Sequence, residues 1–255
     1  MDDVRAVVLD IEGTVLSISF VRDTLFPYAK ENLGKYLKDH WNEPELMKVV
    51  DELRVQAEND RKSGQYNSVP NIPPAAQGDG SLDKSDLLLK SVEANVLWQM
   101  DHDRKTAALK TLQGLIWLQG YCDTRLVAPL YEDVVPALEK WKIEGKRIFI
   151  YSSGSIQAQQ LLFSHTTRGN VCNLLDGYFD IVTSGNKMQP TSYTNISESI
   201  GLPSSRILFL TDVVAEAQAA RAAGMQSRLV VRPGNSPLTD DEKITYQYVS
   251  SFSEL

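Results

Sequence analysis

The 255-residue sequence carries a formal net charge of -7, with 42% hydrophobic and 23% charged residues. This composition is typical of a globular protein, and the negative charge argues against a general surface for nucleic acid or an anionic membrane. No apolar run approaches the roughly 18 to 20 residues that a membrane span needs.

The two cysteines, Cys122 and Cys172, lie far apart without metal-ligand spacing, which favours a reduced intracellular protein. The acidic start Asp2-Asp3 leads directly into an apolar run, which leaves no room for a signal peptide. We therefore expect a cytoplasmic protein, to which the nucleus is also open, without nucleic-acid or membrane partners.

The first predicted element is a buried strand that ends at two carboxylates. Residues 6–9 are apolar without alternation, which is typical of a parallel strand buried on both faces. Asp10 and Glu12 follow directly, and then Gly13 and Thr14. Two carboxylates so close repel each other and need a cation or a proton to coexist. An aspartate that merely ends a strand is the simpler interpretation, so the meaning of Asp10 depends on the rest of the chain.

Residues 20–125 form a predicted helical region without a convincing strand. Apolar residues recur at helical spacing over residues 20–38 and onward to about 59, and again over 83–100 and 103–118. Residues 61–82 hold three prolines and three glycines, which predicts a long loop. Such loops are often functional lids, although a solvent-exposed connector fits the composition equally well.

Strands and helices alternate only after residue 125. Predicted strands cover residues 147–151, 178–183, 206–210 and 228–231, and predicted helices cover 134–144, 156–163, 192–200 and 216–223. This alternation indicates an α/β protein with a doubly wound parallel sheet. We therefore expect a core of residues 1–19 and 126–255, with residues 20–125 inserted after the first strand as an all-helical cap.

Polar residues follow four of the predicted strands. They are Asp10 with Glu12, Ser152 with Ser153, Lys187, and Asp212. Because the carboxyl ends of parallel strands meet at one crevice, we expect these side chains to converge. Carboxylates suit Mg²⁺, hydroxyl and amide groups can cradle a phosphate, and a lysine supplies positive charge to a transferring phosphoryl group. The set predicts a phosphoryl-transfer site in which one carboxylate attacks phosphorus.

Each of these residues also has a simpler interpretation. Ser152 and Ser153 could cap a helix, Lys187 could be a solvated surface lysine, and Asp212 could cap the helix that follows it. These separate interpretations do not explain why all of the residues occur in this order at consecutive strand ends.

The same four segments resemble the motifs of the haloacid dehalogenase superfamily of aspartate-nucleophile phosphohydrolases. The segments are residues 10–14, residues 151–154, Lys187 and residues 210–212. Most of those phosphatases carry an aspartate where Glu12 stands. Glutamate there, together with residues 25–28, 98–100, 103–106 and 231–235, resembles the acireductone synthases, the enolase-phosphatases of methionine salvage. The resemblance extends over nearly the whole chain.

This resemblance implies a monomeric enzyme with one Mg²⁺ per subunit and a small phosphorylated diketone as substrate. The enzyme would enolise a methylthio-substituted dioxopentyl phosphate and then remove the phosphate, which gives the acireductone. By resemblance, Asp10, Glu12 and Asp212 are the metal positions. The resemblance also implies that the substrate phosphate is bound by Ser152, Ser153 and Lys187, whose residue types stand at the matching motif positions.

The resemblance also assigns two catalytic roles. Asp10 would be the nucleophile, and Glu12 would donate and accept the proton. Whether Glu12 meets the metal through its side chain or its main-chain carbonyl stays open, and no group is assigned to take the carbon-bound proton. Within the cap, the loop over residues 61–82 and the face with Trp98 and Lys105 are candidates to contact the methylthio tail, although a role in the cap's own core is the simpler interpretation.

Three departures from the family pattern bear on detail. Residues 15–17 intervene where the family has a Pro-containing step. After Lys187, Gln189 stands where a glutamate is common, and Pro190 is also unexpected.

Two alternative functions stay open. One alternative is a phosphate monoester phosphatase of the same superfamily with another substrate. Another is a catalytically silent binding protein on the same fold, against which the retention of every motif residue argues.

Overall fold

The computed structural model describes residues 3–64, 66, 68–74 and 82–255. It divides into two compact units, one of Met1–Thr24 with Thr124–Leu255 and one of Leu25–Asp123. The predicted boundary lay a few residues away, at residues 19/20 and 125/126.

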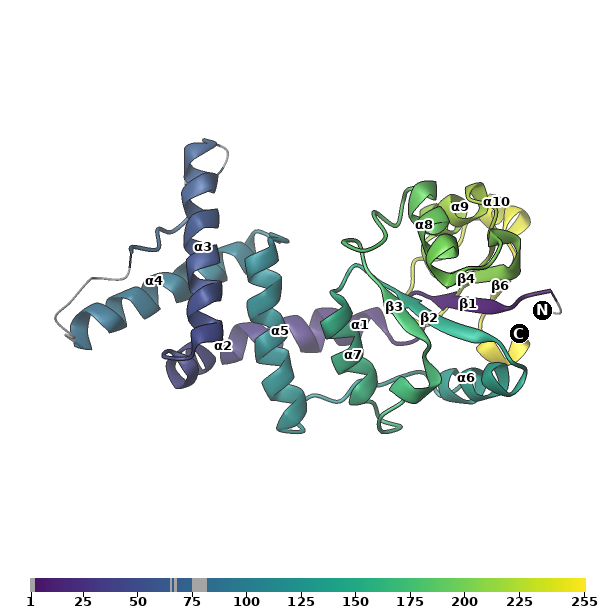
Figure 1. Cartoon of the computed structure of the whole chain (residues 1–255), viewed down its shortest axis with the longest axis horizontal. Helices are drawn as coiled ribbons and strands as arrows, with labels where there is room; N and C mark the ends of the chain where they lie inside the picture. Colours follow the sequence, from purple (N-terminus) through teal and green to yellow (C-terminus); the bar gives the residue numbers. More distant parts are fainter. Residues whose placement is uncertain (1–2, 65, 67, 75–81) are drawn as a thin grey trace. The chain divides into compact units, whose positions relative to one another are not determined.

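The first unit is built on a six-stranded sheet in which every paired neighbour is parallel (Figure 1). The order β3-β2-β1-β4-β5-β6 places the first strand in the middle, with later strands added on both sides of it. This order confirms the predicted doubly wound α/β fold. The strands are β1 (Ala6–Leu9), β2 (Arg147–Tyr151), β3 (Gly177–Phe179), β4 (Ile207–Thr211), β5 (Gln226–Val230) and β6 (Tyr248–Val249).

Helices cover both faces of this sheet. Alternate strand residues such as Ala6, Val8 and Phe209 pack in one apolar cluster with side chains of α8 and α9. Helices α6 and α7 lie on the opposite side (Figure 1). Because both faces are covered, the central strands β1, β2 and β4 are mostly apolar without alternation, as the sequence indicated. The helices of this unit are α1 (Ile18–Phe20), α6 (Val134–Ile143), α7 (Ile156–Ser164), α8 (Pro190–Ile200), α9 (Val214–Ala222) and α10 (Asp240–Thr245).

The second unit is helical, with its own apolar core. A π-helix, Val21–Leu25, leads into α2, and the unit holds α2 (Phe26–His40), α3 (Pro44–Lys62), α4 (Leu82–Asp101) and α5 (Ala107–Cys122). Leu33, Leu53, Val92 and Leu112 come from the four different helices and are fully buried in one cluster. Within the described residues this unit contains no strand, as predicted. Part of the predicted loop over residues 61–82, namely 65, 67 and 75–81, lies outside the described residues.

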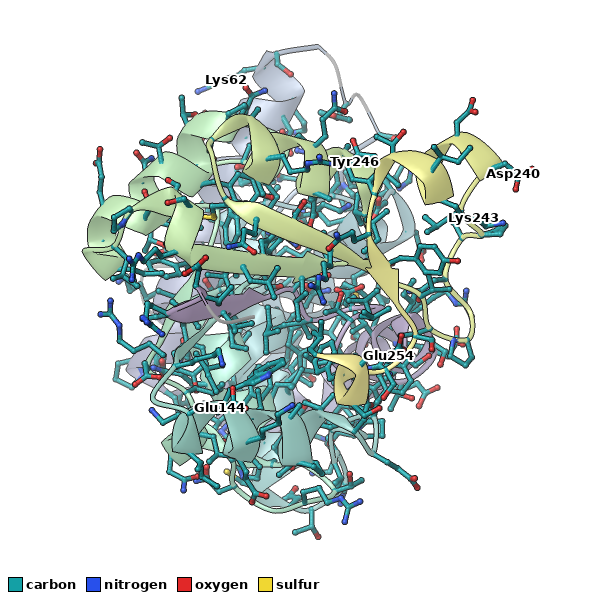
Figure 2. The ribbon with its side chains drawn as sticks, turned by 90° about the vertical axis from the view of Figure 1, so that its right-hand side faces the viewer. Lys62, Glu144, Asp240, Lys243, Tyr246 and Glu254 are labelled. Atoms are coloured by element: carbon teal, nitrogen blue, oxygen red, sulfur yellow. The ribbon has the colours of Figure 1, made fainter. Side chains whose placement is uncertain are left out.

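Two predictions for the sheet were wrong in detail. The strand predicted at 178–183 ends at Phe179, because the Asp180 carboxylate accepts hydrogen bonds from the backbone N–H groups of Val182 and Thr183 and closes a turn. Strand β6 was not predicted, since two residues carry no periodic signal. It follows α10, whose exposed Asp240 and Lys243 are labelled in Figure 2. Among the described residues, no helix has the length and apolar character to cross a membrane.

Candidate active site

Strands β1, β2 and β4 end level with one another. Leu9 is paired with Ile150 on one side and Leu210 on the other. Asp10 therefore leaves the sheet at the same edge as Ser152 and Asp212, which follow those strands by a residue or two. The structure thus brings these predicted site residues to one edge of the sheet, where doubly wound folds bind their ligands.

Asp10, Lys187 and Glu216 form a buried ion-paired cluster at this edge. The Lys187 Nζ lies 2.5 Å from Asp10 Oδ1 and 2.8 Å from Glu216 Oε2. All three side chains are at most 9% exposed. Thr211 Oγ1 also donates to Glu216 Oε2 at 2.8 Å. The interpretation of Lys187 as a solvated surface lysine is therefore wrong, because its ammonium links two buried carboxylates.

The two carboxylates stabilise the charged form of the Lys187 ammonium. Burial by itself lowers the pKa of Lys187, but the carboxylates of Asp10 and Glu216 outweigh burial and raise that pKa above its ordinary value. Burial raises the pKa of Glu216, and the charge of Asp10 raises it further while Lys187 opposes the rise. Lys187 therefore stays protonated at any physiological pH, and its ammonium is a permanent positive charge at this edge of the sheet.

The backbone around Lys187 is held by hydroxyl groups from the sheet and from α8. Tyr193 donates its phenol hydrogen to Lys187 O at 2.8 Å, and Tyr151 donates to Gly185 O at 2.7 Å. Pro190, a departure from the family pattern, occupies the first position of α8. A proline fits there because the first helical N–H has no partner within the helix. The departure is thus compatible with the loop that presents Lys187.

The loop after β1 returns the chain in a tight turn. The backbone N–H groups of Thr14, Val15 and Leu16 all donate to Ile11 O, at 2.9 to 3.2 Å. Gly13 has a φ of 70° in this turn, and a Cβ there would lie 2.6 Å from Asp212 Cγ. Glycine is therefore required at position 13 for two reasons. Another residue would strain the backbone at this φ, and its side chain would displace the Asp212 carboxylate.

Asp212 is half-buried beside this turn and does not cap a helix. Helix α9 has Val213 at its N-cap position and no side-chain cap, so the capping interpretation is wrong. Burial raises the pKa of Asp212 to about 7, and the neighbouring charges of Asp10 and Glu216 raise it in the same direction. A cation beside the Asp212 carboxylate would therefore offset both the cost of burying its charge and its repulsion by Asp10 and Glu216.

The two predicted hydroxyl residues differ in their surroundings. Ser152 is buried, and its Oγ accepts a hydrogen bond from Gly154 N at 3.3 Å. Ser153 is exposed. Neither caps α7, whose N-cap is Ser155 with its hydroxyl accepting from Ala158 N. Ser152 and Ser153 thus directly follow the end of β2, and the interpretation of either as the cap of α7 is wrong.

The oxygens at this edge fit a hydrated Mg²⁺ better than a fully protein-bound ion. Among the described residues, no group of three or more His, Cys, Asp and Glu side chains is arranged to hold a metal. Asp10 Oδ1 is already paired with Lys187, and Glu12 is only half-buried. Mg²⁺ commonly keeps several waters and takes one or two carboxylates. Asp10 and Asp212, with a main-chain carbonyl from the turn, would suffice.

Comparisons with known proteins agree with this geometry. Residues 4–224 match the haloacid dehalogenase-like hydrolase family. The chain is 45% identical to enolase-phosphatase E1 of Xenopus tropicalis, covering 99% of this chain and 94% of the relative. It is 44% identical to enolase-phosphatase E1 of Danio rerio, covering 100% and 95%. The chain belongs to the enolase-phosphatase E1 family. A crystal structure of the UTR4 protein of Saccharomyces cerevisiae is also similar, with a TM-score of 0.76 and 32% identity over 99% of this chain and 100% of that one.

One charged member of the buried cluster in this enolase-phosphatase family protein was not predicted from the sequence. Glu216 lies in the first turn of α9, four residues after Asp212, and it is 6% exposed. A glutamate early in a helix is usually solvated and favourable to the helix dipole, so its position gave no signal by itself. The spacing from Asp212 was the usable signal, because a first-turn residue after β4 points back to the strand edge.

The cysteines, two of the histidines and Lys105 have surroundings of their own. The two cysteines are free, with Cys122 exposed and Cys172 half-buried. His40 pairs with Glu43, and His102 stacks on Trp98 within the helical unit. Trp98 thus takes part in packing of that unit, and the exposed Lys105 lies 3.4 Å from Asp103.

We predict that Asp212→Asn stabilises the metal-free protein at alkaline pH. A carboxyl whose pKa is raised on folding, here to about 7, loses stability as the pH rises from its unfolded value near 3.8 through 7. After allowance for solvent screening, the gain should be at least about 1 kcal/mol at pH 8, or about 2–4 °C in Tm.

Thermal unfolding of both proteins in EDTA, from pH 5 to pH 8, measures this effect. The difference in Tm should shrink towards pH 5, where wild-type Asp212 is protonated as well. A variant that is less stable than wild type at pH 8 would contradict the raised pKa of Asp212.

Proposed function

We propose that this chain is a Mg²⁺-dependent enolase-phosphatase that converts the methylthio-substituted dioxopentyl phosphate to the acireductone and inorganic phosphate. The observation that carries the proposal is the buried cluster of Asp10, Lys187 and Glu216 beside Asp212. Membership of the enolase-phosphatase E1 family supports the substrate class.

Asp10 is the proposed nucleophile. Its Oδ1 is held by Lys187, while Thr14 Oγ1 reaches Oδ2 only at 3.4 Å. Oδ2 is therefore the less engaged oxygen, and it would attack the phosphorus and form an aspartyl phosphate as the ester P–O bond breaks. Because Lys187 fixes Oδ1, Oδ2 is already oriented before the reaction. Less orientational entropy is then lost on reaching the transition state.

Lys187, Ser152 and Ser153 are the proposed phosphate-binding residues. Lys187 carries a permanent positive charge in a site with little water, where its interaction with phosphoryl oxygens is strongest. Because Glu216 shares the ammonium with Asp10, it keeps Lys187 in place when the Asp10 carboxylate becomes esterified. Glu216 thus acts as a positioning residue for the lysine.

Asp10, Asp212 and Glu12 are the proposed metal positions, with Glu12 also the proposed proton donor and acceptor. A bound Mg²⁺ would neutralise the carboxylates and polarise the substrate's oxygens. Glu12 is half-buried and two residues beyond the proposed nucleophile. In the proposed reaction it protonates the leaving enediol oxygen and then takes a proton from the water that hydrolyses the aspartyl phosphate.

We predict that removal of Mg²⁺ abolishes phosphate release from the diketone phosphate. EDTA should reduce the rate to background, and added Mg²⁺ should restore it, since two carboxylates that repel each other otherwise face the substrate's phosphate. Ultraviolet absorbance should show a transient enediol phosphate before inorganic phosphate appears. Full activity in EDTA would contradict a metal-dependent site.

The alternative is a phosphatase of the same superfamily with a different substrate. A panel of sugar and glycolytic phosphates, assayed beside the diketone phosphate, separates the two proposals. Comparable turnover of several of these phosphates, without the enediol absorbance, would favour the alternative. We further propose a cytoplasmic monomer, which size-exclusion chromatography with light scattering and cell fractionation would test.

A further inference from the structure

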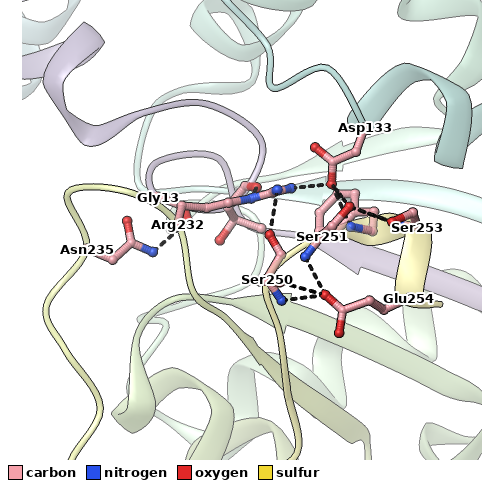
Figure 3. Close-up of polar contacts among 10 residues, drawn as sticks. Gly13, Asp133, Arg232, Asn235, Ser250, Ser251, Ser253 and Glu254 are labelled. Atoms are coloured by element: carbon pink, nitrogen blue, oxygen red, sulfur yellow. Dashed lines mark hydrogen bonds and ion pairs between the residues drawn. The ribbon is translucent and has the colours of Figure 1, made fainter.

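Two side chains beyond β5 hold the loop that follows Asp10. Asn235 Nδ2 donates to Gly13 O at 2.9 Å, and Arg232 Nε donates to Thr14 O at 3.3 Å (Figure 3). Arg232 is 7% exposed, and its remaining nitrogens donate to Ser250 O and to Asp133 Oδ2, both at 2.9 Å. Arg232 thus ties the turn after Asp10 to the segment that follows β6 and to the start of α6.

The hydrogen bonds of Asn235 fix which way its amide faces. Nδ2 donates to two carbonyls, Gly13 O at 2.9 Å and Val230 O at 3.2 Å, and only the nitrogen end of the amide can satisfy both. Oδ1 therefore faces the other way. It lies 2.9 Å from the position that a Cβ on Gly13 would take, and Asp212 Cγ lies 2.6 Å from the same position. The amide oxygen and the Asp212 carboxylate are neighbours above Gly13.

The Asn235 amide oxygen and the Asp212 carboxylate are both hydrogen-bond acceptors when Asp212 is ionised. Asn235 Oδ1 is buried, and it makes no hydrogen bond with any of the described residues. A buried acceptor without a partner is unfavourable. The nearby Asp212 carboxylate is an acceptor as well when ionised, so the two oxygens require a proton-bearing group that both can share.

We propose that Asn235 is a positioning residue of the cation site, whose Oδ1 accepts a hydrogen bond from a water on the divalent cation held by Asp10 and Asp212. This inference rests on the proposed Mg²⁺ dependence. Mg²⁺ suits the arrangement because it retains waters, and a fixed outer acceptor orients such a water and strengthens metal binding. Asn235 also donates to the Gly13 carbonyl through Nδ2. One side chain would therefore position both the metal-bound water and the turn.

The test is Mg²⁺ binding to metal-free Asn235→Ala and wild-type protein, with Mg²⁺ alone and no substrate, by isothermal titration calorimetry and by the Mg²⁺-induced rise in Tm. We expect the Kd for Mg²⁺ to weaken about 10-fold in the variant. The matched control is Gln226→Ala, because Gln226 also donates its amide to a backbone carbonyl, Ser205 O at 2.9 Å, at the opposite end of β5. The control should keep the wild-type Kd.

Each outcome decides between specific interpretations. An unchanged Kd in Asn235→Ala, even with a lower metal-free Tm, would overturn the inference and leave Asn235 as a structural support for Gly13. No binding of millimolar Mg²⁺ by the wild type would overturn the proposed metal dependence itself. A crystal structure with Mg²⁺ provides the second readout: a metal-bound water on Asn235 Oδ1 supports the inference, and its absence there contradicts it whatever the Kd.

Discussion

Asp10→Asn is expected to lower the rate of phosphate release by at least about 10³-fold, because the amide cannot attack phosphorus. The substitution is nearly isosteric, and its amide oxygen can still accept from Lys187, whose second partner Glu216 is unaffected. The folded structure should therefore survive, with a metal-free Tm close to that of wild type. Single-turnover release of phosphate from the diketone phosphate, at saturating Mg²⁺, measures the loss.

Two companion measurements keep this result specific. Acid quenching during turnover of substrate with labelled phosphate should trap label on wild-type protein and none on Asp10→Asn. Asp176→Asn is the matched control, since Asp176 also pairs with a lysine, Lys142, at 2.9 Å, and it should retain wild-type activity. Release by Asp10→Asn within tenfold of wild type would rule out Asp10 as the nucleophile.

Lys187→Met is expected to destabilise the protein by about 3–5 kcal/mol near pH 8, because it leaves two buried carboxylates without their cation. For a protein of this size the loss corresponds to about 2–4 °C of Tm per kcal/mol. The loss should diminish as the pH falls, since burial raises the pKa of Glu216 and its protonation removes one uncompensated charge. Activity should be lost at every pH because the variant lacks the cation that we propose binds the substrate phosphate.

The double variant Lys187→Met/Glu216→Gln separates charge compensation from catalysis. It removes one of the two stranded carboxylates, so it should recover much of the lost Tm without recovering activity. Lys142→Met is the control for loss of a lysine from a more exposed pair, and it should cost less than about 1 kcal/mol. A Lys187→Met protein as stable as wild type at pH 8 would show that the buried cluster does not depend on its cation.

The convergence of the site could be predicted from the sequence because it follows from sheet topology. Asp10, Ser152 and Asp212 each end or follow an apolar strand, and the ends of neighbouring parallel strands lie side by side. Lys187 does not directly follow its strand, β3, which ends at Phe179. The sequence therefore did not indicate that the Lys187 side chain is buried. The resemblance of the four segments to known motifs supplied the identity of the family, which topology alone does not give.

The remaining features depend on tertiary contacts that leave little local signal. Glu216 has the sequence context of an ordinary first-turn glutamate, and only the structure reveals its bond to Lys187. Asn235 follows a Pro-Gly pair that indicates a turn, yet its amide lies against Gly13, more than two hundred positions away. The end of β3 was missed because Asp180 closes a turn with side-chain hydrogen bonds that outweigh the strand propensity of Val182.

A crystal structure with Mg²⁺ and orthovanadate tests the central claim most directly, because vanadate mimics the transferring phosphoryl group. We expect vanadium bonded to an Asp10 carboxylate oxygen, with Lys187 and Ser152 donating to its oxygens and Asp212 on the metal. Vanadate bound away from Asp10, or a metal site that excludes both Asp10 and Asp212, would contradict it.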